Sequence, residues 1–307
     1  MSKNILECSR AGDDNFSAMK AKVLVNGVNA TIETHYQRAK AFVGENGELY
    51  TVNSPMDAKG KKPVAFKISG YFLPLDYGAM FYDLMWYKYL KANPNLEQIL
   101  EKYDDYSDKY KSKIAHNCQA DSIRKYMQRN GSLLPKNERG SEIMKDCKPL
   151  LDFLRGVNRI AIQEGDIFEG YTNIIGHQVN CQGVMGKGIA STIRRKYPQA
   201  YNEYIRFSKL NKNDLLGKAQ LIDCGDKHIC NLYGQEYYGN KKTMIYTSYE
   251  DLKKSLISLK DEAKLKGLVV GLPYGIGCGL ANGSWEKVYE IIKDVFSDYY
   301  VILYKYD

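Results

Sequence analysis

The sequence lacks any apolar run long enough to span a bilayer, which takes about 20 residues. Its first residues, Met-Ser-Lys-Asn-Ile-Leu-Glu-Cys, contain no apolar stretch of signal-peptide length. We therefore expect a cytoplasmic protein with no membrane partner.

Histidine is scarce, and cysteine follows no recognisable pattern. The chain has four His, none placed as part of a metal-ligand set, and seven Cys, an odd number whose spacings fit neither a disulfide framework nor a zinc site. We therefore expect reduced thiols, no bound metal and no cofactor.

Acidic residues are fewer than basic ones, 36 against 44, so the formal net charge is +8. An excess of positive charge favours polyanionic partners such as pyrophosphates, nucleotides or nucleic acid, but it does not choose among them. The 307 residues suggest about two domains. Residues 135–142 combine Pro, Gly and charge, which is typical of a boundary. We expect a first domain at residues 1–140, a linker at 141–156 and a second domain at 157–307.

The first half has the pattern of an α+β domain. Alternating apolar residues on both sides of Asn26-Gly27 predict a β-hairpin over residues 22–32. Helical periodicity predicts helices at the following residues: 31–43, 77–92, 95–103 and 118–129.

The second half alternates strand and helix signals, which predicts an α/β domain with a mixed sheet flanked by helices. Ser248 and Ser284 are placed to cap the last two helices. The predicted strands are residues 159–163, 173–179, 219–223, 228–233, 268–272 and 300–304, and the predicted helices are residues 189–207, 249–266 and 285–296.

Two glycine-rich segments, residues 178–190 and 272–280, each follow a predicted strand and precede a helix. Glycine lets a ligand approach the backbone closely, and free N–H groups at the start of a helix bind anions. A single glycine-rich segment of this kind is also typical of a tight turn. Because both lie in one domain, where ligands bind at the carboxyl ends of strands, we expect them to hold one diphosphate from two sides.

These segments, together with Gly165-Asp166-Ile167 and residues 231–234, resemble the macrodomain family. The second half looks most like its small hydrolase branch, which includes the DarG-type antitoxin macrodomains and glycohydrolases that remove terminal ADP-ribose from carboxylates. The resemblance implies that Asp166 and Ile167 recognise adenine, although Asp after Gly is also common in turns. The ADP-ribose site that the resemblance implies consists of Asp166, Ile167, Asn180, Gly183, Val184, Met185, Gly186, Gly188, Ile189, Gly275, Ile276, Gly277, Cys278, Gly279 and Leu280.

Two positions depart from the glycohydrolase branch. Gln235 stands where that branch has Lys, with Lys241 or Lys242 as alternatives, and Ala281 stands where it has Asp. Glutamine forms no Schiff base and alanine is neither acid nor base. The second half therefore either hydrolyses by another route, aided by Asn180, or binds without turnover.

Residues 32–40 place Glu33 and Lys40, with Gln37 between them, at spacings that share one helix face. Such a face is most often a solvated ion-pair ladder. With Asn15-Phe16-Ser17, the hairpin and the junction at residues 88–96, it resembles the NADAR family, named for its links to NAD and ADP-ribose. That family includes N-glycosidases and enzymes that remove ADP-ribose from guanine. The resemblance makes Glu33 and Lys40 candidates for acid/base or iminium chemistry at ribose C1, with Asp121 as a third.

Three functions fit two modules that are both linked to ADP-ribose. The first is an ADP-ribosyl hydrolase or N-glycosidase that cleaves an ADP-ribose conjugate, to reverse ADP-ribosylation or to process an NAD-derived metabolite. The second is a protein that captures ADP-ribose, or a signalling nucleotide derived from it, without turnover. The third is a reader of ADP-ribosylated nucleic acid, which the positive charge favours. Gln235 and Ala281 favour binding for the second half, whereas Glu33 and Lys40 favour catalysis for the first.

Overall fold

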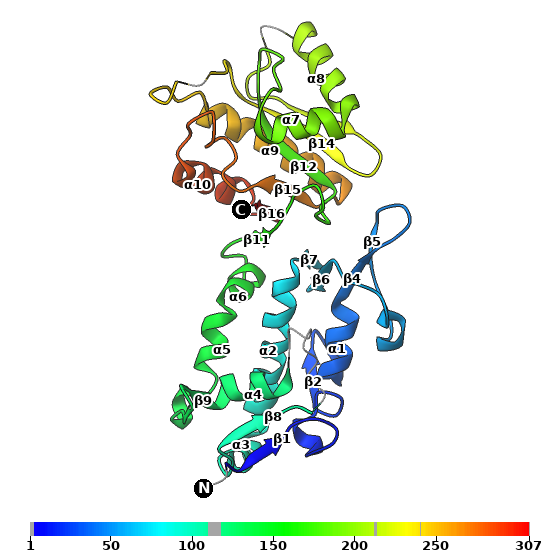
Figure 1. The fold of residues 1–307 in the computed structure, drawn as a ribbon, viewed down its shortest axis with the longest axis vertical. Coiled ribbons are helices and arrows are strands. Elements are labelled where there is room, and N and C mark those ends of the chain that lie inside the picture. Colours follow the sequence, from blue (N-terminus) through cyan, green and yellow to red (C-terminus); the bar gives the residue numbers. More distant parts are fainter. Residues whose placement is uncertain (1–2, 110–117, 212–213, 240, 307) are drawn as a thin grey trace. The chain divides into compact units, whose positions relative to one another are not determined.

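The computed structural model describes residues 3–109, 118–211, 214–239 and 241–306. The chain divides into two compact units, Met1–Leu154 and Arg155–Asp307, each with its own hydrophobic core (Figure 1). None of the helices in the described residues combines the length and the apolar character that crossing a bilayer requires.

Unit 1 mixes short strands with helices, as predicted. Its strands form a four-stranded antiparallel sheet in the order β5-β4-β6-β7 and smaller two-stranded pairs. The strands are β1 (Ile5–Glu7), β2 (Lys22–Val25), β3 (Val28–Thr31), β4 (Lys40–Val43), β5 (Leu49–Thr51), β6 (Ala65–Ile68), β7 (Tyr71–Leu73), β8 (Asp105–Ser107), β9 (Gln128–Arg129) and β10 (Ser132–Leu133). The helices are α1 (Ile32–Ala39), α2 (Leu75–Ala92), α3 (Pro94–Leu100), α4 (Gln119–Met127), α5 (Ser141–Asp146) and α6 (Lys148–Leu154).

The hairpin predicted around Asn26-Gly27 is confirmed. Strands β2 and β3 pair antiparallel, and both turn residues have positive φ, 49° for Asn26 and 80° for Gly27. Asn-Gly tolerates this backbone, whose twist matches that of the strands it joins.

The helix predicted over residues 31–43 is wrong in its second part. Thr31 caps it as expected, since its hydroxyl oxygen accepts the Thr34 N–H at 3.1 Å. The helix ends at Ala39, however, and residues 40–43 form β4, in which Lys40 pairs with Phe66 of β6. Sheet pairing overrides the local helical periodicity here, so Lys40 follows the helix that carries Glu33.

Helix α2 is the centre of the unit 1 core. Its Trp86 is fully buried, and the helix packs against α1, α4 and α5. The last of these neighbours, α5, lies in the predicted linker, and its Ile143 is buried in the same core.

Unit 2 is a six-stranded mixed sheet flanked by helices, as predicted. The strand order is β11-β16-β15-β12-β14-β13, and only the edge pair β13–β14 is antiparallel among these described strands. The strands are β11 (Ile160–Glu164), β12 (Ile174–Asn180), β13 (Ala219–Asp223), β14 (His228–Gln235), β15 (Val270–Pro273) and β16 (Val301–Lys305), and the helices are α7 (Gly188–Lys196), α8 (Pro198–Leu210), α9 (Tyr249–Lys266) and α10 (Trp285–Val295).

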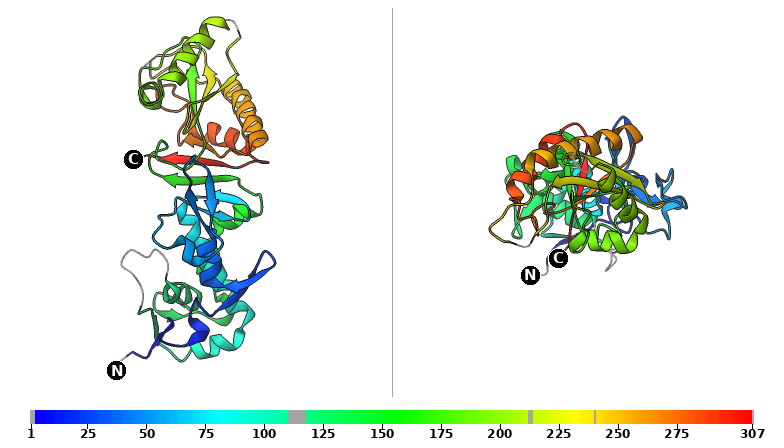
Figure 2. Two further views of the ribbon diagram at one scale, coloured as in Figure 1. Left: turned by 90° about the vertical axis from the view of Figure 1, so that its right-hand side faces the viewer. Right: turned by 90° about the horizontal axis from the view of Figure 1, so that it is seen from above.

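The helices cover both faces of this sheet (Figure 2). One face packs with α9 and α10, through residues such as Leu256 and Ile292. The other face packs with α8, where Tyr204 lies against Tyr233. The carboxyl ends of the parallel strands therefore open at one edge, between the two layers of helices.

Two local predictions in unit 2 are corrected. The helix predicted over residues 189–207 is two helices, because Pro198 lacks an N–H and keeps Tyr197 out of the helical conformation. Ser248 caps α9 as predicted, but Ser284 makes no side-chain cap bond within the described chain. Its N–H instead donates to the Tyr249 hydroxyl at 2.8 Å.

His177 lies at the centre of the sheet, on β12, and is completely buried. Its Nε2 lies 2.7 Å from Oδ1 of Asn231 on the neighbouring β14. Burial lowers the pKa of His177 to about 4, against a weaker opposing effect of the Asn231 hydrogen bond. The imidazole is therefore neutral in the folded protein at neutral pH.

This burial predicts that unit 2 loses stability in mild acid. The unfolded chain binds a proton at His177 near pH 6.5, whereas the folded protein resists it until about pH 4, so acidification favours unfolding over this interval. Between about pH 7.5 and about pH 4.5 the wild type should lose about 2 to 3 kcal/mol more protection of the β12 amides than His177→Gln, as measured by hydrogen exchange. An equal loss in both proteins would contradict the prediction.

Candidate functional site

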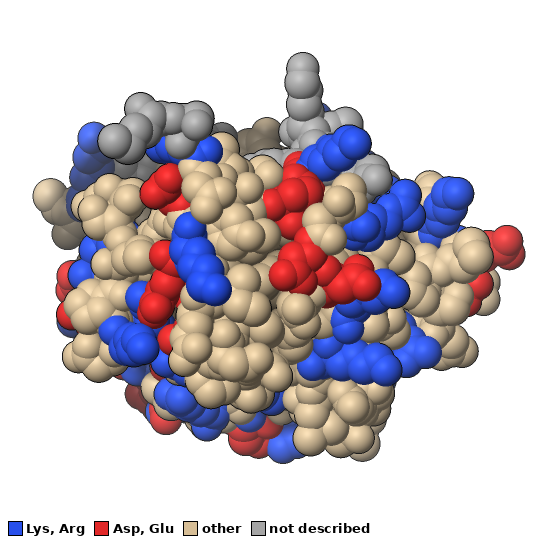
Figure 3. All heavy atoms as spheres, turned by 90° about the horizontal axis from the view of Figure 1, so that it is seen from below, with Lys and Arg blue, Asp and Glu red and all other residues tan. Residues whose placement is uncertain are grey.

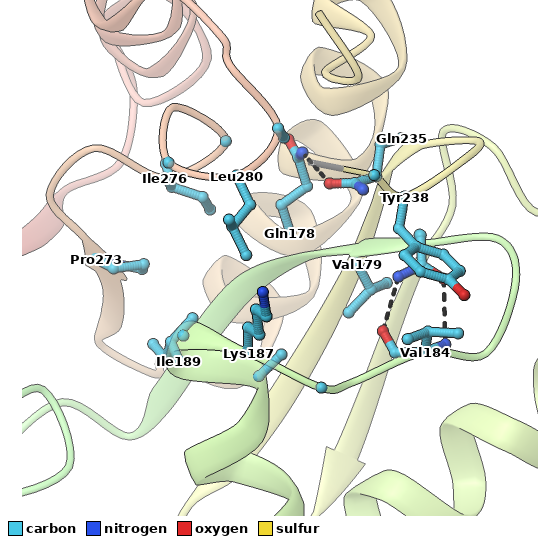
Figure 4. Close-up of a pocket in the computed structure, with 18 of the residues that line it drawn as sticks. Gln178, Val179, Val184, Lys187, Ile189, Gln235, Tyr238, Pro273, Ile276 and Leu280 are labelled. Atoms are coloured by element: carbon cyan, nitrogen blue, oxygen red, sulfur yellow. Dashed lines mark hydrogen bonds between the residues drawn. The ribbon is translucent and has the colours of Figure 1, made fainter. Parts of the chain in front are cut away.

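A cavity of about 650 Å³ opens at the carboxyl ends of β12, β14 and β15 (Figure 4). This is the edge at which sheets of this type bind ligands, and the volume suits a nucleotide-sized molecule. The residues that line it are Gln178, Val179, Asn180, Val184, Gly186, Lys187, Gly188, Ile189, Ala190, Gln235, Tyr238, Gly239, Pro273, Gly275, Ile276, Gly277, Gly279, Leu280 and Ala281.

Both glycine-rich loops expected from the sequence contribute to this lining. The predicted ligand-binding residues that face the cavity are Asn180, Val184, Gly186, Gly188, Ile189, Gly275, Ile276, Gly277, Gly279 and Leu280. Three further predicted residues, Gly183, Met185 and Cys278, belong to the same loops but lie outside the lining among the described residues. The structure thus brings two segments together that are far apart in the sequence.

Asp166 and Ile167 follow β11 and lie outside the cavity lining formed by the described residues. The half-buried Asp166 accepts the N–H of Phe168 at Oδ1, 2.9 Å away, which is the turn geometry that Asp often adopts. A carboxylate has lone pairs beyond this bond. Recognition of adenine by Asp166 therefore stays a prediction.

The buried side chain of Asn180 shapes the first glycine-rich loop. Its Nδ2 donates to the carbonyl of Val184 at 2.7 Å, and its Oδ1 accepts the N–H groups of Gln182 and Val184 at 3.0 and 3.2 Å. The hydroxyl of Tyr204 donates to the Asn180 carbonyl at 2.7 Å. The side-chain amide of Asn180 therefore positions the loop.

The first loop leads directly into the N-terminus of α7, at the cavity. Gly188 has a φ of 59°, a left-handed conformation that other residues rarely adopt. Lys187 at the N-cap makes no side-chain cap bond within the described residues. The N–H groups of the first turn thus keep the capacity to bind an anion.

The second loop is tied to the sheet through Thr247. Gln178 donates from Nε2 to the Thr247 hydroxyl at 3.0 Å, and that hydroxyl donates to the carbonyl of Gly277 at 2.6 Å. Gly277 has a φ of 74°, and a Cβ there would lie 2.7 Å from Oε1 of Gln178. Glycine is therefore required at 277 for both conformation and space.

Gln235 and Ala281, which replace the expected Lys and Asp, both line the cavity. The Gln235 side chain accepts from Gln178 Nε2 at 2.8 Å and donates to the Tyr237 carbonyl at 3.0 Å. Neither residue supplies an amine or an acid. The two differences from the glycohydrolase branch therefore lie in the cavity.

The segment 178–190 predicted to hold the diphosphate includes Lys187 and Gln178, but neither was singled out as a site residue, and Tyr238 was not predicted. Among the lining residues in the described chain, Lys187 alone carries a charge, and Figure 4 shows it pointing into the cavity. Its position between two glycines of the first loop was a usable signal, since a cation beside exposed backbone N–H groups suits a diphosphate. Gln178 and Tyr238 gave no comparable signal, because their contribution depends on the pairing of β12 with β14 and on the loop that follows β14.

In unit 1, Glu33 and Lys40 interact although Lys40 begins a strand. The negative charge of Glu33 raises the pKa of Lys40, but the larger effect of burial lowers it, so the net pKa lies below its usual value. The Lys40 ammonium is 5.1 Å from the centre of the Tyr36 ring. Glu33 is half-buried, and its Oε1 accepts from Gln37 Nε2 at 2.7 Å. The two groups thus share one partly desolvated environment.

Asp121 on α4 forms an ion pair with Arg124, 2.6 Å between Oδ1 and Nη1. Arg124 also binds the Asp105 carboxylate at 2.8 Å and the Tyr106 carbonyl. These contacts join α4 to β8 and give Asp121 a structural part. A catalytic role for Asp121 stays a prediction.

Comparison with known proteins confirms both resemblances. Residues 1–156 match the family described as DarT1-associated NADAR antitoxin, and residues 177–292 match the family described as Macro domain. ADP-ribose 1''-phosphate phosphatase of Debaryomyces hansenii is 29% identical over 176 residues, which cover 47% of this chain and 97% of that protein. DNA ADP-ribosyl glycohydrolase of Mycobacterium tuberculosis is 29% identical over 141 residues, which cover 45% of this chain and 38% of that protein. The solved macrodomain of Mycobacterium tuberculosis DarG is 26% identical, with a TM-score of 0.42, and the match covers 48% of this chain and 97% of that one.

The cavity geometry predicts that Gly186→Glu abolishes binding of ADP-ribose without unfolding the protein. A Cβ at Gly186 meets no described atom within 4 Å, so the side chain is accommodated. Its carboxylate would face a bound diphosphate, and like charges about 4 Å apart repel by about 4 kcal/mol near a protein surface. Calorimetry should show an affinity loss of at least about a hundredfold.

Gly186→Gln is the matched control, because it has nearly the same size and no charge. It should bind more tightly than Gly186→Glu, and both should melt like the wild type. Wild-type affinity for ADP-ribose in Gly186→Glu would show that this loop is not the phosphate site.

Proposed function

Because the chain belongs to the DarT1-associated NADAR antitoxin family and carries a macrodomain, we propose that it removes ADP-ribose from ADP-ribosylated DNA. In this proposal unit 1 cleaves the bond to the distal ribose. The macrodomain cavity binds an ADP-ribose group, of the same substrate or of a second one. The observation that carries this division is the contrast between Gln235 with Ala281 in the cavity and Glu33 with Lys40 in unit 1.

Cleavage of a ribosyl bond builds positive charge at ribose C1. A nearby carboxylate stabilises that charge or activates water, and an amine can instead capture C1 covalently. Glu33 supplies the carboxylate, which Gln37 holds in place. The lowered pKa of Lys40 increases the share of neutral amine, the form that attacks carbon. Both routes lead through the same pair of residues.

The choice of DNA as the modified molecule rests on two supports. One relative is named DNA ADP-ribosyl glycohydrolase, and the net charge of this chain is +8. Figure 3 shows one face of the molecule on which Lys and Arg lie interspersed with Asp and Glu. That face does not present a single-sign patch, so the net charge supports a polyanionic substrate without locating it there.

A second function, capture of ADP-ribose or of a nucleotide derived from it, is favoured by the cavity alone. Gln235 and Ala281 supply neither an amine nor an acid at the two positions where the glycohydrolase branch has Lys and Asp. A site that binds and does not turn over its ligand would have this composition. The two functions differ in whether product is released.

Glu33→Gln should lower the rate of ADP-ribose release at least about a hundredfold, the usual effect of losing an acid/base group. Gln235→Ala should leave the rate within about threefold of wild type, because its amide is neither acid nor base. Full-length proteins are incubated with ADP-ribosylated DNA, ADP-ribosylated protein and ADP-ribose 1''-phosphate, and the products are identified by mass spectrometry.

The exposed Glu45→Gln in the same unit is the matched control and should retain wild-type activity. Loss of turnover in Gln235→Ala, with full turnover in Glu33→Gln, would assign catalysis to the macrodomain instead. Binding without product from any of the three substrates would favour the capture function.

A further inference from the structure

An exposed segment follows β14 at the mouth of the unit 2 cavity. We call residues 236–239 and 241–246 the rim segment. We propose that the rim segment binds the single-stranded nucleic acid that carries the ADP-ribose, with Tyr237 stacked on a base and Lys241 and Lys242 beside the phosphates. This inference rests on the proposed function for the identity of its substrate.

The rim segment is held against the second glycine-rich loop by hydrogen bonds. Asn282 donates from Nδ2 to the carbonyls of Lys241 and Met244, at 3.0 and 2.7 Å. The N–H of Tyr246 donates to the carbonyl of Ala281 at 2.8 Å. These bonds fix the rim segment beside the second glycine-rich loop, whose Ala281 lines the cavity.

The cavity continues into the rim segment. Gln235, Tyr238 and Gly239 line the cavity, and Figure 4 shows the Tyr238 ring at its edge beside Val184. A Cβ at Gly239 would lie 2.1 Å from the Tyr246 hydroxyl, so the chain turns here against the Tyr246 ring. Tyr237 is adjacent to Tyr238 in the chain and lies outside the lining formed by the described residues.

Large apolar side chains of the rim segment are exposed. Tyr237 and Tyr238 are 57% and 55% exposed, and Met244 and Ile245 are 47% and 61% exposed. Adjacent exposed apolar groups at the mouth of a cavity mark a contact surface. Aromatic rings offer a stacking surface to any base, each contact being worth about fivefold or more in affinity.

The charges of the rim segment complement a nucleic acid backbone. Lys241 and Lys242 are exposed, and Lys187 of the first loop points into the cavity (Figure 4). Glu236 is the opposing charge, and it forms a hydrogen bond with the Tyr237 hydroxyl. Exposed aromatic rings next to lysines are the combination that binds single strands, in which bases are unstacked and available. An acidic protein surface would use the lysines and leave the rings unused.

The test compares full-length Tyr237→Ala and the double variant Lys241→Ala/Lys242→Ala with Tyr306→Ala, a control at a tyrosine that is 77% exposed. All carry Glu33→Gln so that substrate is not consumed. Fluorescence anisotropy measures the Kd for an ADP-ribosylated single-stranded oligonucleotide, the same oligonucleotide unmodified, an ADP-ribosylated duplex and an ADP-ribosylated protein. Calorimetry measures the Kd for free ADP-ribose.

Tyr237→Ala should raise the Kd for the modified single strand at least about fivefold and leave the Kd for free ADP-ribose unchanged. The double lysine variant should also reduce the salt dependence, by about 0.7 per lost phosphate contact in log Kd against log salt. Tyr306→Ala should match its parent throughout. The duplex should show no effect of Tyr237→Ala, because its bases are already stacked.

The rim proposal is overturned if Tyr237→Ala leaves the Kd for both single strands unchanged. It is also overturned if Tyr237→Ala raises the Kd for free ADP-ribose and for the oligonucleotide by the same factor. An equal rise in the Kd for an ADP-ribosylated protein would also overturn the proposal, because it would indicate a general apolar contact. The proposed function fails separately. Suppose that Tyr237→Ala weakens binding of the unmodified strand while the wild-type protein releases no ADP-ribose from modified DNA. That result would support nucleic-acid binding by the rim segment and contradict the proposed function.

Discussion

The hydrogen bonds of Asn180 hold the first glycine-rich loop in the conformation on which the unit 2 cavity depends. Backbone N–H groups bind a diphosphate only where no side chain stands between them and the ligand. Asn180 holds the loop through hydrogen bonds with Gln182 and Val184, and residues 186–190 of the same segment line the cavity. Thr247 does the same for the second loop through the Gly277 carbonyl. The sheet thereby brings the two glycine-rich loops together, and the side chains that shape them, Asn180 and Thr247, are uncharged.

The two units differ in the chemistry that their sites carry. The cavity of unit 2 is built from backbone, apolar side chains and amides, with Lys187 as the charge in its described lining. Such a site favours affinity and orientation over proton transfer. Unit 1 holds a carboxylate and a partly buried amine whose charges influence each other, at Glu33 and Lys40. In the proposed function the macrodomain binds ADP-ribose and unit 1 cleaves the bond to it.

Much of unit 2 followed from its sequence because its signals are local. Each strand is a short apolar run bounded by turn residues, and each glycine-rich loop lies between a strand and a helix. The single helix predicted across Pro198 failed because periodicity was given more weight than the missing N–H at that residue. In unit 1 the helix predicted over residues 31–43 extended too far, because the pairing of Lys40 with Phe66 is a long-range contact that helical spacing does not reveal. Tyr238 was missed for the same reason, since only the folded sheet brings it to the cavity.

The most direct test of this account is a crystal structure of the full chain with ADP-ribose bound. The account predicts that the diphosphate lies between the two glycine-rich loops, with its oxygens about 3 Å from backbone N–H groups of residues 186–190. Lys187 should lie beside the same oxygens. ADP-ribose bound with its diphosphate away from both loops, or bound only outside this cavity, would contradict the account.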